Sequence, residues 1–267
     1  MNKKMALIAT GVALLAVLLI FCGMQLLSMP DPKGIPILEY HMVQAVDPDR
    51  AYEYNVPPDE FEAQLDYLEQ EGYTTISIRD FLRAKKGLQD LPDKPVILTF
   101  DDGYKTNYTE LLPILEKRGL KATIFVVVND IGKERYMSWD QLRDIQHRGV
   151  EIGSHTANHL PLGKMDKTQA RDEMRLSKLL MEWNGMDTIY TLSYPNGSYS
   201  NELVAMLKEE EYLAAVTGDS GLNDFDTDPY LLHRINIPHP MFGITEFKWR
   251  LMKGKLMTRL GIFQHKS

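Results

Sequence analysis

From residue 35 onward, two kinds of hydrophobic pattern alternate along the chain. Short apolar runs rich in Val, Ile and aromatic residues, bounded by Gly, Pro or polar residues, are typical of buried β-strands. Between them lie longer stretches in which apolar residues recur every three or four positions, as they do on one face of an α-helix. The predicted strands occupy residues 35–41, 74–78, 95–100, 121–127, 149–154, 189–194, 213–217 and 232–237.

The amphipathic stretches predict helices. In residues 57–72, Phe61 and Leu68 lie on the same face of the predicted helix. Ser138 and Gln141 match the capping box that begins a helix. The predicted helices occupy residues 57–72, 107–120, 138–149 and 167–185, and each ends at or near a glycine.

This alternation of strands and helices predicts parallel strands. The number of units between residues 35 and 267 is about what a distorted (β/α) barrel of about seven parallel strands requires. A doubly wound open sheet is the alternative. In either architecture the carboxyl ends of the strands meet at one edge, and reactive side chains are expected there.

The N-terminal segment has a different pattern. Residues 5–27 contain no charge and follow Lys3 and Lys4, and this length can span ~30 Å of hydrocarbon as one helix. The apolar region of a cleaved signal peptide is usually shorter, roughly 7–15 residues. We therefore expect a single-pass anchor in the cell membrane, with the globular domain outside the cytoplasm, or a secreted protein if the segment is cleaved. The predicted division is an anchor or signal peptide over 1–28, a tether over 29–34 and one domain over 35–267.

Composition narrows the classes of partner. Hydrophobic residues make up 44% of the 267 residues and charged residues 25%, which suits a globular protein. The single cysteine, Cys22, excludes an intramolecular disulfide and a cysteine metal site. Without Lys3 and Lys4, 28 basic residues face 37 acidic ones, a net charge of −9. Nucleic acid is therefore not an expected partner, whereas a neutral or cationic polymer is compatible with this charge.

Polar residues that can do chemistry follow several predicted strands. His41, Asp101 with Asp102, His155 and the Tyr-Pro-Asn-Gly turn at 194–197 each stand at a strand end. Each one alone is ordinary, because strand-end histidines often pack and Asp-Gly or Asn-Gly sequences are common turns. Their shared location predicts one active site at the carboxyl edge of the sheet.

His155 and His159 are spaced as metal ligands often are. They stand four residues apart, so a helical turn after the strand would bring both imidazoles to one side. Asp101 or Asp102 can complete a two-histidine, one-carboxylate site for a divalent metal, with zinc first and cobalt, nickel or manganese as alternatives. The other aspartate would be free to accept a proton from water. Two solvated histidines on a surface turn are the competing interpretation.

The Thr-Phe-Asp-Asp-Gly motif at 99–103 and the His-Thr-Ala-Asn-His motif at 155–159 resemble those of the polysaccharide deacetylase family (carbohydrate esterase family 4, the NodB-homology domain). The resemblance extends over residues 35–237. It implies a distorted (β/α) barrel and metal-dependent N-deacetylation of glycans that contain N-acetylglucosamine. It also implies that Asp101 is the base and that Asp102, His155 and His159 bind the metal.

Two departures from the family pattern direct attention to a branch of it. The third motif, Leu-Ser-Tyr-Pro-Asn-Gly at 192–197, lacks the usual arginine, and a late Leu-x-His motif is not evident. However, residues 36–41 resemble the opening of a circularly permuted branch that includes the poly-β-1,6-N-acetylglucosamine deacetylases. That resemblance implies His41 as the catalytic acid. Arg234 is a candidate for the missing arginine that orients Asp101.

The predicted function is removal of acetyl groups from an N-acetylglucosamine polymer at the cell surface, with the membrane contacted through residues 5–27. The backbone N–H of Asn196, in a turn that also contains Tyr194, is expected to stabilise the oxyanion or bind substrate. His233 and His239 are alternative acids. A peptidoglycan or chitooligosaccharide deacetylase and a non-catalytic glycan-binding module are the alternative functions.

A basic amphipathic segment follows the last predicted strand. Residues 247–263 combine Lys and Arg with recurring apolar residues. The segment is either a helix that closes the domain with a solvated basic face or a helix that lies on a membrane surface.

Overall fold

The computed structural model describes residues 30–45 and 53–263, and six separate positions between 11 and 25. The chain divides into two units, Met1–Lys33 and Gly34–Ser267. Among the described residues, every buried hydrophobic side chain lies between Ile35 and Met257, so the second unit has its own core and can fold on its own.

Most of the predicted anchor, residues 5–27, lies outside the described residues. Within the described part of the chain, no helix combines the length and the apolar character needed to cross a membrane. The division into anchor, tether and domain therefore stays a prediction.

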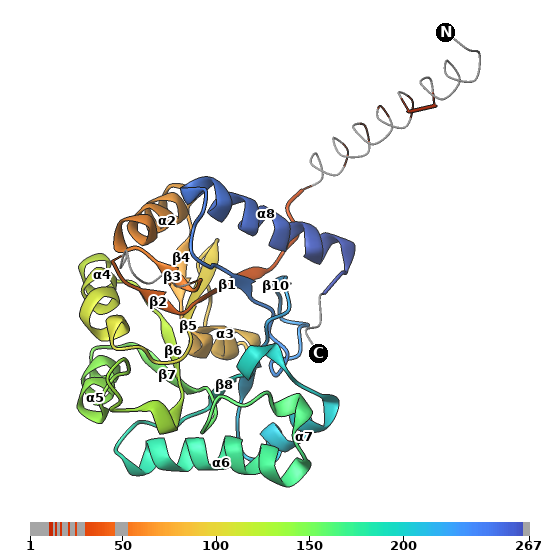
Figure 1. Cartoon of the computed structure of the whole chain (residues 1–267). Helices are drawn as coiled ribbons and strands as arrows, with labels where there is room; N and C mark the ends of the chain where they lie inside the picture. The colour runs from red at the N-terminus through yellow and green to blue at the C-terminus, as the bar shows by residue number, and fades with distance from the viewer. Residues whose placement is uncertain are drawn as a thin grey trace. The chain divides into compact units, whose positions relative to one another are not determined.

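Parallel strands form the centre of the second unit (Figure 1). In spatial order they run β1, β5, β6, β7, β8 and β9, while β11 pairs with the other side of β1 and β4 pairs with β5. These strands are β1 (Ile35–Tyr40), β4 (Thr74–Ile76), β5 (Pro95–Phe100), β6 (Thr123–Val126), β7 (Glu151–Ser154), β8 (Thr191–Ser193), β9 (Ala214–Val216) and β11 (Ile235–Asn236). The predicted α/β architecture of mostly parallel strands is confirmed.

The two ends of this sheet are joined irregularly. A single parallel bridge links Val216 of β9 to Leu232, and the chain then enters β11 beside β1. An antiparallel strand, β10 (Leu222–Asn223), pairs with the start of β1, and β2 (Met42–Val43) and β3 (Asn55–Val56) form a separate pair. The hydrophobic pattern does not predict these short strands.

Helices surround the strands in Figure 1. Those at the predicted places are α2 (Pro58–Gln70), α4 (Leu112–Arg118), α5 (Trp139–His147) and α6 (Lys167–Trp183). The predicted capping box of α5 is present, because Ser138 and Gln141 each bond the other's backbone N–H. A π-helix, Asn107–Leu111, replaces the first part of the predicted helix 107–120.

The remaining helices are α3 (Ile78–Lys85), α7 (Asn201–Glu209) and α8 (Gly243–Leu260). The prediction of a strand to residue 78 was wrong at its end. The Ser77 hydroxyl accepts a hydrogen bond from Asp80 N–H, and this capping box starts α3 where the strand was expected to continue.

The inward-facing residues of the strands explain where a polar site can form. Successive strand residues point to opposite faces, so every second residue of β1 and β5 faces the interior. At the amino ends these residues are apolar: Ile35, Ile37 and Ile97 pack with Phe81 of α3 in one buried cluster. At the carboxyl ends the same rows continue as Glu39, His41, Thr99 and Asp101. The interior is therefore apolar at one end and polar at the other.

Candidate active site

A cavity of about 350 Å³ lies at the carboxyl ends of the strands. Its lining residues include Glu39, His41, Tyr54, Asp101, Asp102, Tyr104, His155, His159, Tyr194, Asn196 and Arg234. All eight sequence-predicted site residues are in this set. A larger cavity of about 660 Å³ opens elsewhere, beside α2 and the start of β4, and contains none of them.

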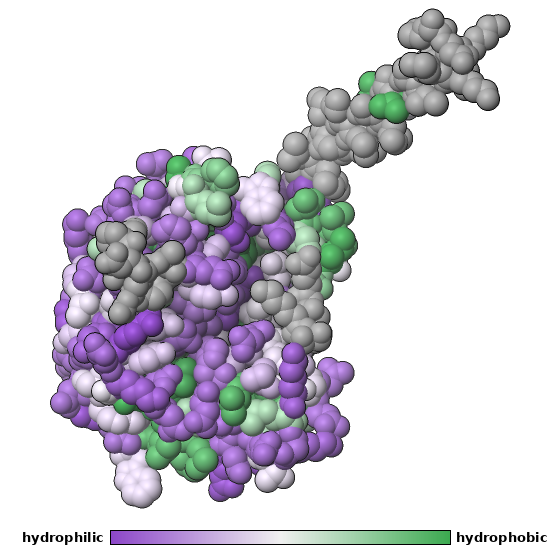
Figure 2. Space-filling view, in the orientation of Figure 1, coloured by the Kyte–Doolittle hydropathy of each residue, from purple (hydrophilic) through white to green (hydrophobic). Residues whose placement is uncertain are grey.

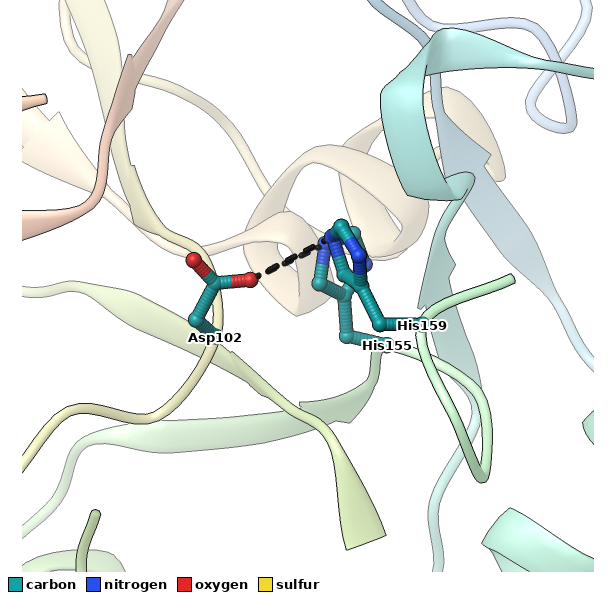
Figure 3. Close-up of side chains that lie close together, drawn as sticks. All are labelled: Asp102, His155 and His159. Carbon is teal, nitrogen blue, oxygen red and sulfur yellow. Dashed lines mark ion pairs between the residues drawn. The ribbon is translucent and has the colours of Figure 1, made fainter. Parts of the chain in front are cut away.

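Asp102, His155 and His159 converge on one point (Figure 3). The Oδ1 atom of Asp102 lies 3.6 Å from Nε2 of His155 and 3.4 Å from Nε2 of His159. The two imidazole rings meet edge to face, with centroids 4.7 Å apart. The three side chains thus offer two nitrogens and one oxygen around a common centre.

This donor set fits a divalent transition metal. Ligand atoms held at ~2.0–2.1 Å from a tetrahedral ion lie about 3.3 Å from each other, close to the separations between Asp102 and the two histidines. His155 Nδ1 lies 2.8 Å from the Ser193 carbonyl oxygen, to which it can only donate, so Nε2 is left as an acceptor. Burial lowers the pKa of His155 despite the nearby carboxylates, and this favours the neutral, ligating imidazole.

The backbone that holds these residues is unusual. Asp102 has φ 74°, Thr156 has φ 68° and His159 has φ 57°, all in the left-handed region that costs energy for residues other than glycine. With Asn196 they make up four of the five such residues in the described part of the chain. The expected helical turn between the two histidines was therefore wrong, and turns with left-handed residues bring the rings together instead.

A buried carboxylate fixes the loop between the histidines. The side chain of Glu173, on the inner face of α6, accepts hydrogen bonds from the backbone N–H and the side-chain amide of Asn158 at 2.8 and 2.6 Å. His159 N–H in turn donates to the Thr156 hydroxyl at 3.1 Å. Glu173 was not among the predicted site residues. The available signal was a charged residue on a face of the predicted helix 167–185 that also carries Ala170, Met174 and Met181.

Asp101 has different hydrogen-bond partners from Asp102, although His155 Nε2 lies near both, 3.8 Å from Oδ2 of Asp101 and 3.6 Å from Oδ1 of Asp102. Its two carboxylate oxygens each accept a hydrogen bond at 2.8 Å from the guanidinium of Arg234, which is itself fully buried. The Ser193 hydroxyl adds a third bond at 3.0 Å. Burial opposes ionisation of Asp101, but the charge and hydrogen bonds of Arg234, together with the nearby His155 and His41, outweigh it and hold the pKa of Asp101 well below its usual value.

Arg234 is shared by a second acid. Its Nη2 atom lies 3.3 Å from Oε1 of Glu39, and its Nε donates to the Thr217 carbonyl at 2.9 Å. Glu39 and Ser193 were both missed by the sequence analysis. The inward alternation of β1 was the available signal for Glu39, because it places that residue on the same face as His41.

His41 lies beside Asp101 and Glu39. Its ring packs against Tyr54, with centroids 4.5 Å apart, and its Nδ1 atom is buried without a hydrogen bond to any residue that the structure describes. His41, Glu39 and Asp101 offer ligand or acceptor atoms within 4.8 Å of one another. The alternative acids, His233 and His239, are not among the lining residues of the cavity.

The turn after β8 closes the cavity. Asn196 has φ 56° and is exposed. The N–H groups of Gly197 and Ser198 bond within the turn, whereas that of Asn196 makes no hydrogen bond in the part of the chain that the structure describes. The Tyr194 side chain is fully buried, and its hydroxyl donates to the Tyr230 carbonyl at 3.2 Å. Asn196, which lines the cavity, therefore has a backbone donor that is available to a ligand.

Fold and site together define a hydrolase-type centre in an α/β half-barrel of mostly parallel strands: three side chains that could hold a metal ion, beside a buried, charge-paired carboxylate. Residues 88–215 match the family model described as polysaccharide deacetylase. The chain is 33% identical over 212 residues to YxkH of Bacillus subtilis (strain 168), provisionally named a polysaccharide deacetylase, with 79% of this chain and 74% of that protein covered. The chain belongs to the polysaccharide deacetylase family, which hydrolyses N-acetyl amide bonds.

Two further comparisons bear on substrate and fold. The poly-β-1,6-N-acetyl-D-glucosamine N-deacetylase of Staphylococcus epidermidis is 24% identical over 238 residues, covering 79% of this chain and 82% of that protein. The structure of the Streptococcus pyogenes deacetylase PplD in complex with acetate superposes with a TM-score of 0.75 and 28% identity, covering 84% of this chain and 99% of that one.

Proposed function

We propose that the domain removes acetyl groups from β-linked N-acetylglucosamine polymer, with poly-β-1,6-N-acetylglucosamine as the substrate and zinc as the metal. The observation that carries this proposal is the contrast between two adjacent carboxylates. Asp102 faces two histidines, whereas Asp101 is locked by Arg234 and Ser193. One acid is thus arranged to bind a cation and the other to accept a proton.

In this proposal Asp102, His155 and His159 hold the metal. A bound divalent ion supplies Lewis acidity, which lowers the pKa of water and polarises a carbonyl oxygen. Asp101, kept ionised and fixed in orientation by Arg234, accepts the proton of the attacking water. The shared location of the four side chains at one cavity supports this division of roles.

The remaining groups act on the oxyanion and on the leaving amine. The unused N–H of Asn196 is suited to stabilise the charge that develops on the carbonyl oxygen. His41 donates a proton to the glucosamine nitrogen as the C–N bond breaks, and acetate leaves. Its contact with Tyr54 and its place beside Asp101 support this role.

The substrate and the location rest on separate observations. The Staphylococcus epidermidis relative is named for poly-β-1,6-N-acetyl-D-glucosamine, and an acidic chain suits a neutral polymer that gains positive charge as acetyl groups are removed. The uncharged stretch 5–27 supports a membrane anchor with the domain outside the cytoplasm.

The test is release of acetate by residues 30–267, supplied with zinc, from three substrates: β-1,6-linked N-acetylglucosamine oligomers, chitin oligomers and peptidoglycan. We expect the β-1,6 oligomers to give the highest kcat/KM. Asp101→Asn should abolish release, whereas Asp140→Asn, a matched change on the exposed first turn of α5, should leave it unchanged. A higher kcat/KM on chitin oligomers or peptidoglycan would refute the substrate, and wild-type turnover by Asp101→Asn would refute the base.

A further inference from the structure

Helix α8 has two apolar stripes on opposite sides. The inner stripe, Phe247, Leu251, Gly254 and Met257, is buried and faces α2 and the strands. A second set of apolar residues recurs at the same helical spacing on the other side. This outer stripe consists of Trp249, Met252, Leu256 and Leu260 on the helix, together with Phe242 at its N-cap.

Most of the outer stripe is exposed to solvent, while Leu256 is half-buried. Phe242 is 73% exposed, Trp249 51% and Leu260 50%. Figure 2 shows apolar surface at both ends of α8 on an otherwise largely hydrophilic face. A surface helix of a globular protein normally turns polar residues outward, so an outward apolar stripe indicates that something covers it.

The charge around this stripe has the opposite sign to that of the chain. Helix α8 carries five Lys or Arg residues and one acid, Glu246, which is paired with Arg250 at 2.6 Å, whereas the whole chain has a net charge of −7. Two of the cations lie beside the stripe. The Lys253 ammonium lies 5.6 Å from the centroid of the Trp249 ring. Lys248 precedes Trp249 in the sequence, and its ammonium lies 4.5 Å from the centroid of the Tyr67 ring of α2.

We propose that the outer stripe of α8 lies on an anionic membrane surface. An apolar stripe with aromatic residues, bordered by lysines, is the pattern of a helix that lies in the lipid interface, where apolar side chains enter the acyl boundary and cations contact acidic headgroups. The helix has 18 residues, about 27 Å of length that can lie flat on a bilayer. A second copy of the chain is disfavoured as the occupant, because two such helices would bring like charges together.

The test uses residues 30–267, a fragment that keeps the whole described core and lacks the stretch 5–27. The fragment is sedimented with phosphatidylcholine vesicles that contain either no anionic lipid or 30% phosphatidylglycerol. We expect binding to the anionic vesicles only, and weaker binding as salt is added.

Two pairs of variants separate the apolar and the charged contributions. Trp249→Ser/Met252→Ser should weaken the partition coefficient at least about tenfold. Lys248→Gln/Lys253→Gln should weaken it about 25-fold, since each lysine near the surface contributes about fivefold. All four side chains lie outside the cavity, so acetate release from soluble oligomers should not change.

Matched controls carry the same substitutions elsewhere. Trp183→Ser, on the far exposed end of α6, and Lys86→Gln/Lys117→Gln should bind like the wild type. Equal binding by Trp249→Ser/Met252→Ser, or no binding of the wild type to anionic vesicles, would overturn the proposal. A dimer in solution that Trp249→Ser/Met252→Ser dissociates would also overturn it, because the stripe would then be covered by a second copy.

Discussion

Replacing Arg234 with methionine tests whether its pairing with Asp101 is energetically important. The change removes both 2.8 Å hydrogen bonds to the carboxylate and keeps an unbranched apolar side chain in place of the aliphatic part of arginine. Asp101 would keep the Ser193 hydroxyl, at 3.0 Å, and would lose its directly paired cation. Both side chains are almost fully buried, so water from the adjoining cavity can replace the lost cation only in part.

The expected cost is large. Removing one partner of a buried ion pair costs about 3–5 kcal/mol, because the remaining charge is buried without compensation. Exchanging Asp101 for asparagine in the same protein removes that charge. The double variant Arg234→Met/Asp101→Asn should therefore be more stable than Arg234→Met alone, and the coupling free energy between the two sites should be at least about 2 kcal/mol.

Equilibrium unfolding in urea, followed by circular dichroism on residues 30–267 in EDTA, measures these values without any contribution from bound metal. Its pH dependence supplies a second test. In the wild type the folded pKa of Asp101 lies below its unfolded value, so its contribution is complete above about pH 4 and is lost as the pH falls further. In Arg234→Met, burial without the guanidinium raises that pKa, so the free energy of unfolding relative to wild type should recover as the pH falls from 7.

Two results would contradict this reasoning. One is additivity, in which Arg234→Met costs the same whether residue 101 is Asp or Asn. The other is a difference between wild type and Arg234→Met that does not change with pH. Either would mean that the guanidinium stabilises the domain through Thr217 and general packing rather than through Asp101.

Three further predictions follow from the site and from the surface. Asp102→Ala should lose bound metal while Asp101→Asn retains it, measured as metal content after dialysis; equal retention would refute the division of roles. His41→Ala should lower kcat for acetate release by about 10²–10⁴ with little change in metal content, and an unchanged kcat would remove it as the acid. Burial raises the pKa of Asp80, but Lys121 and the capping box lower it to about 2. Asp80→Asn should therefore lower the free energy of unfolding by about 1 kcal/mol at pH 7. This difference should disappear as the pH falls from about 4 to 2.

The strands could be predicted because apolar residues are dense in them and because side chains alternate every two residues along a strand. All eight predicted runs contain strand residues, and the β5 boundaries, 95–100, agree with the prediction. The elements that were predicted wrongly or not at all depend on short-range side-chain hydrogen bonds or on pairing between distant segments. The capping box of Ser77 and Asp80 starts α3 inside a predicted strand. Strand β10 pairs with β1, which is far from it in the sequence.

The candidate site was predictable to the extent that its residues directly follow strands. Asp101, Asp102 and His155 each follow a strand, so the parallel architecture alone brings them to one edge. Glu39 and Glu173 could not be found in this way. Each lies inside an element, and its role depends on which partner the fold places opposite it, Arg234 for one and Asn158 for the other.

The position of Arg234 shows how the site tolerates a third motif without arginine. Ser193 stands in the strand where that arginine was expected, and its hydroxyl lies within 3.1 Å of both Asp101 and the Arg234 guanidinium. A serine is small enough to leave room for the guanidinium of Arg234, which directly precedes β11, the strand that pairs with the side of β1 opposite β5. Arginine at position 193 would place a second cation in the same buried space, and its desolvation would be offset only by sharing one carboxylate. The altered motif and the buried arginine are therefore best understood as one arrangement, in which a change at either position requires the other.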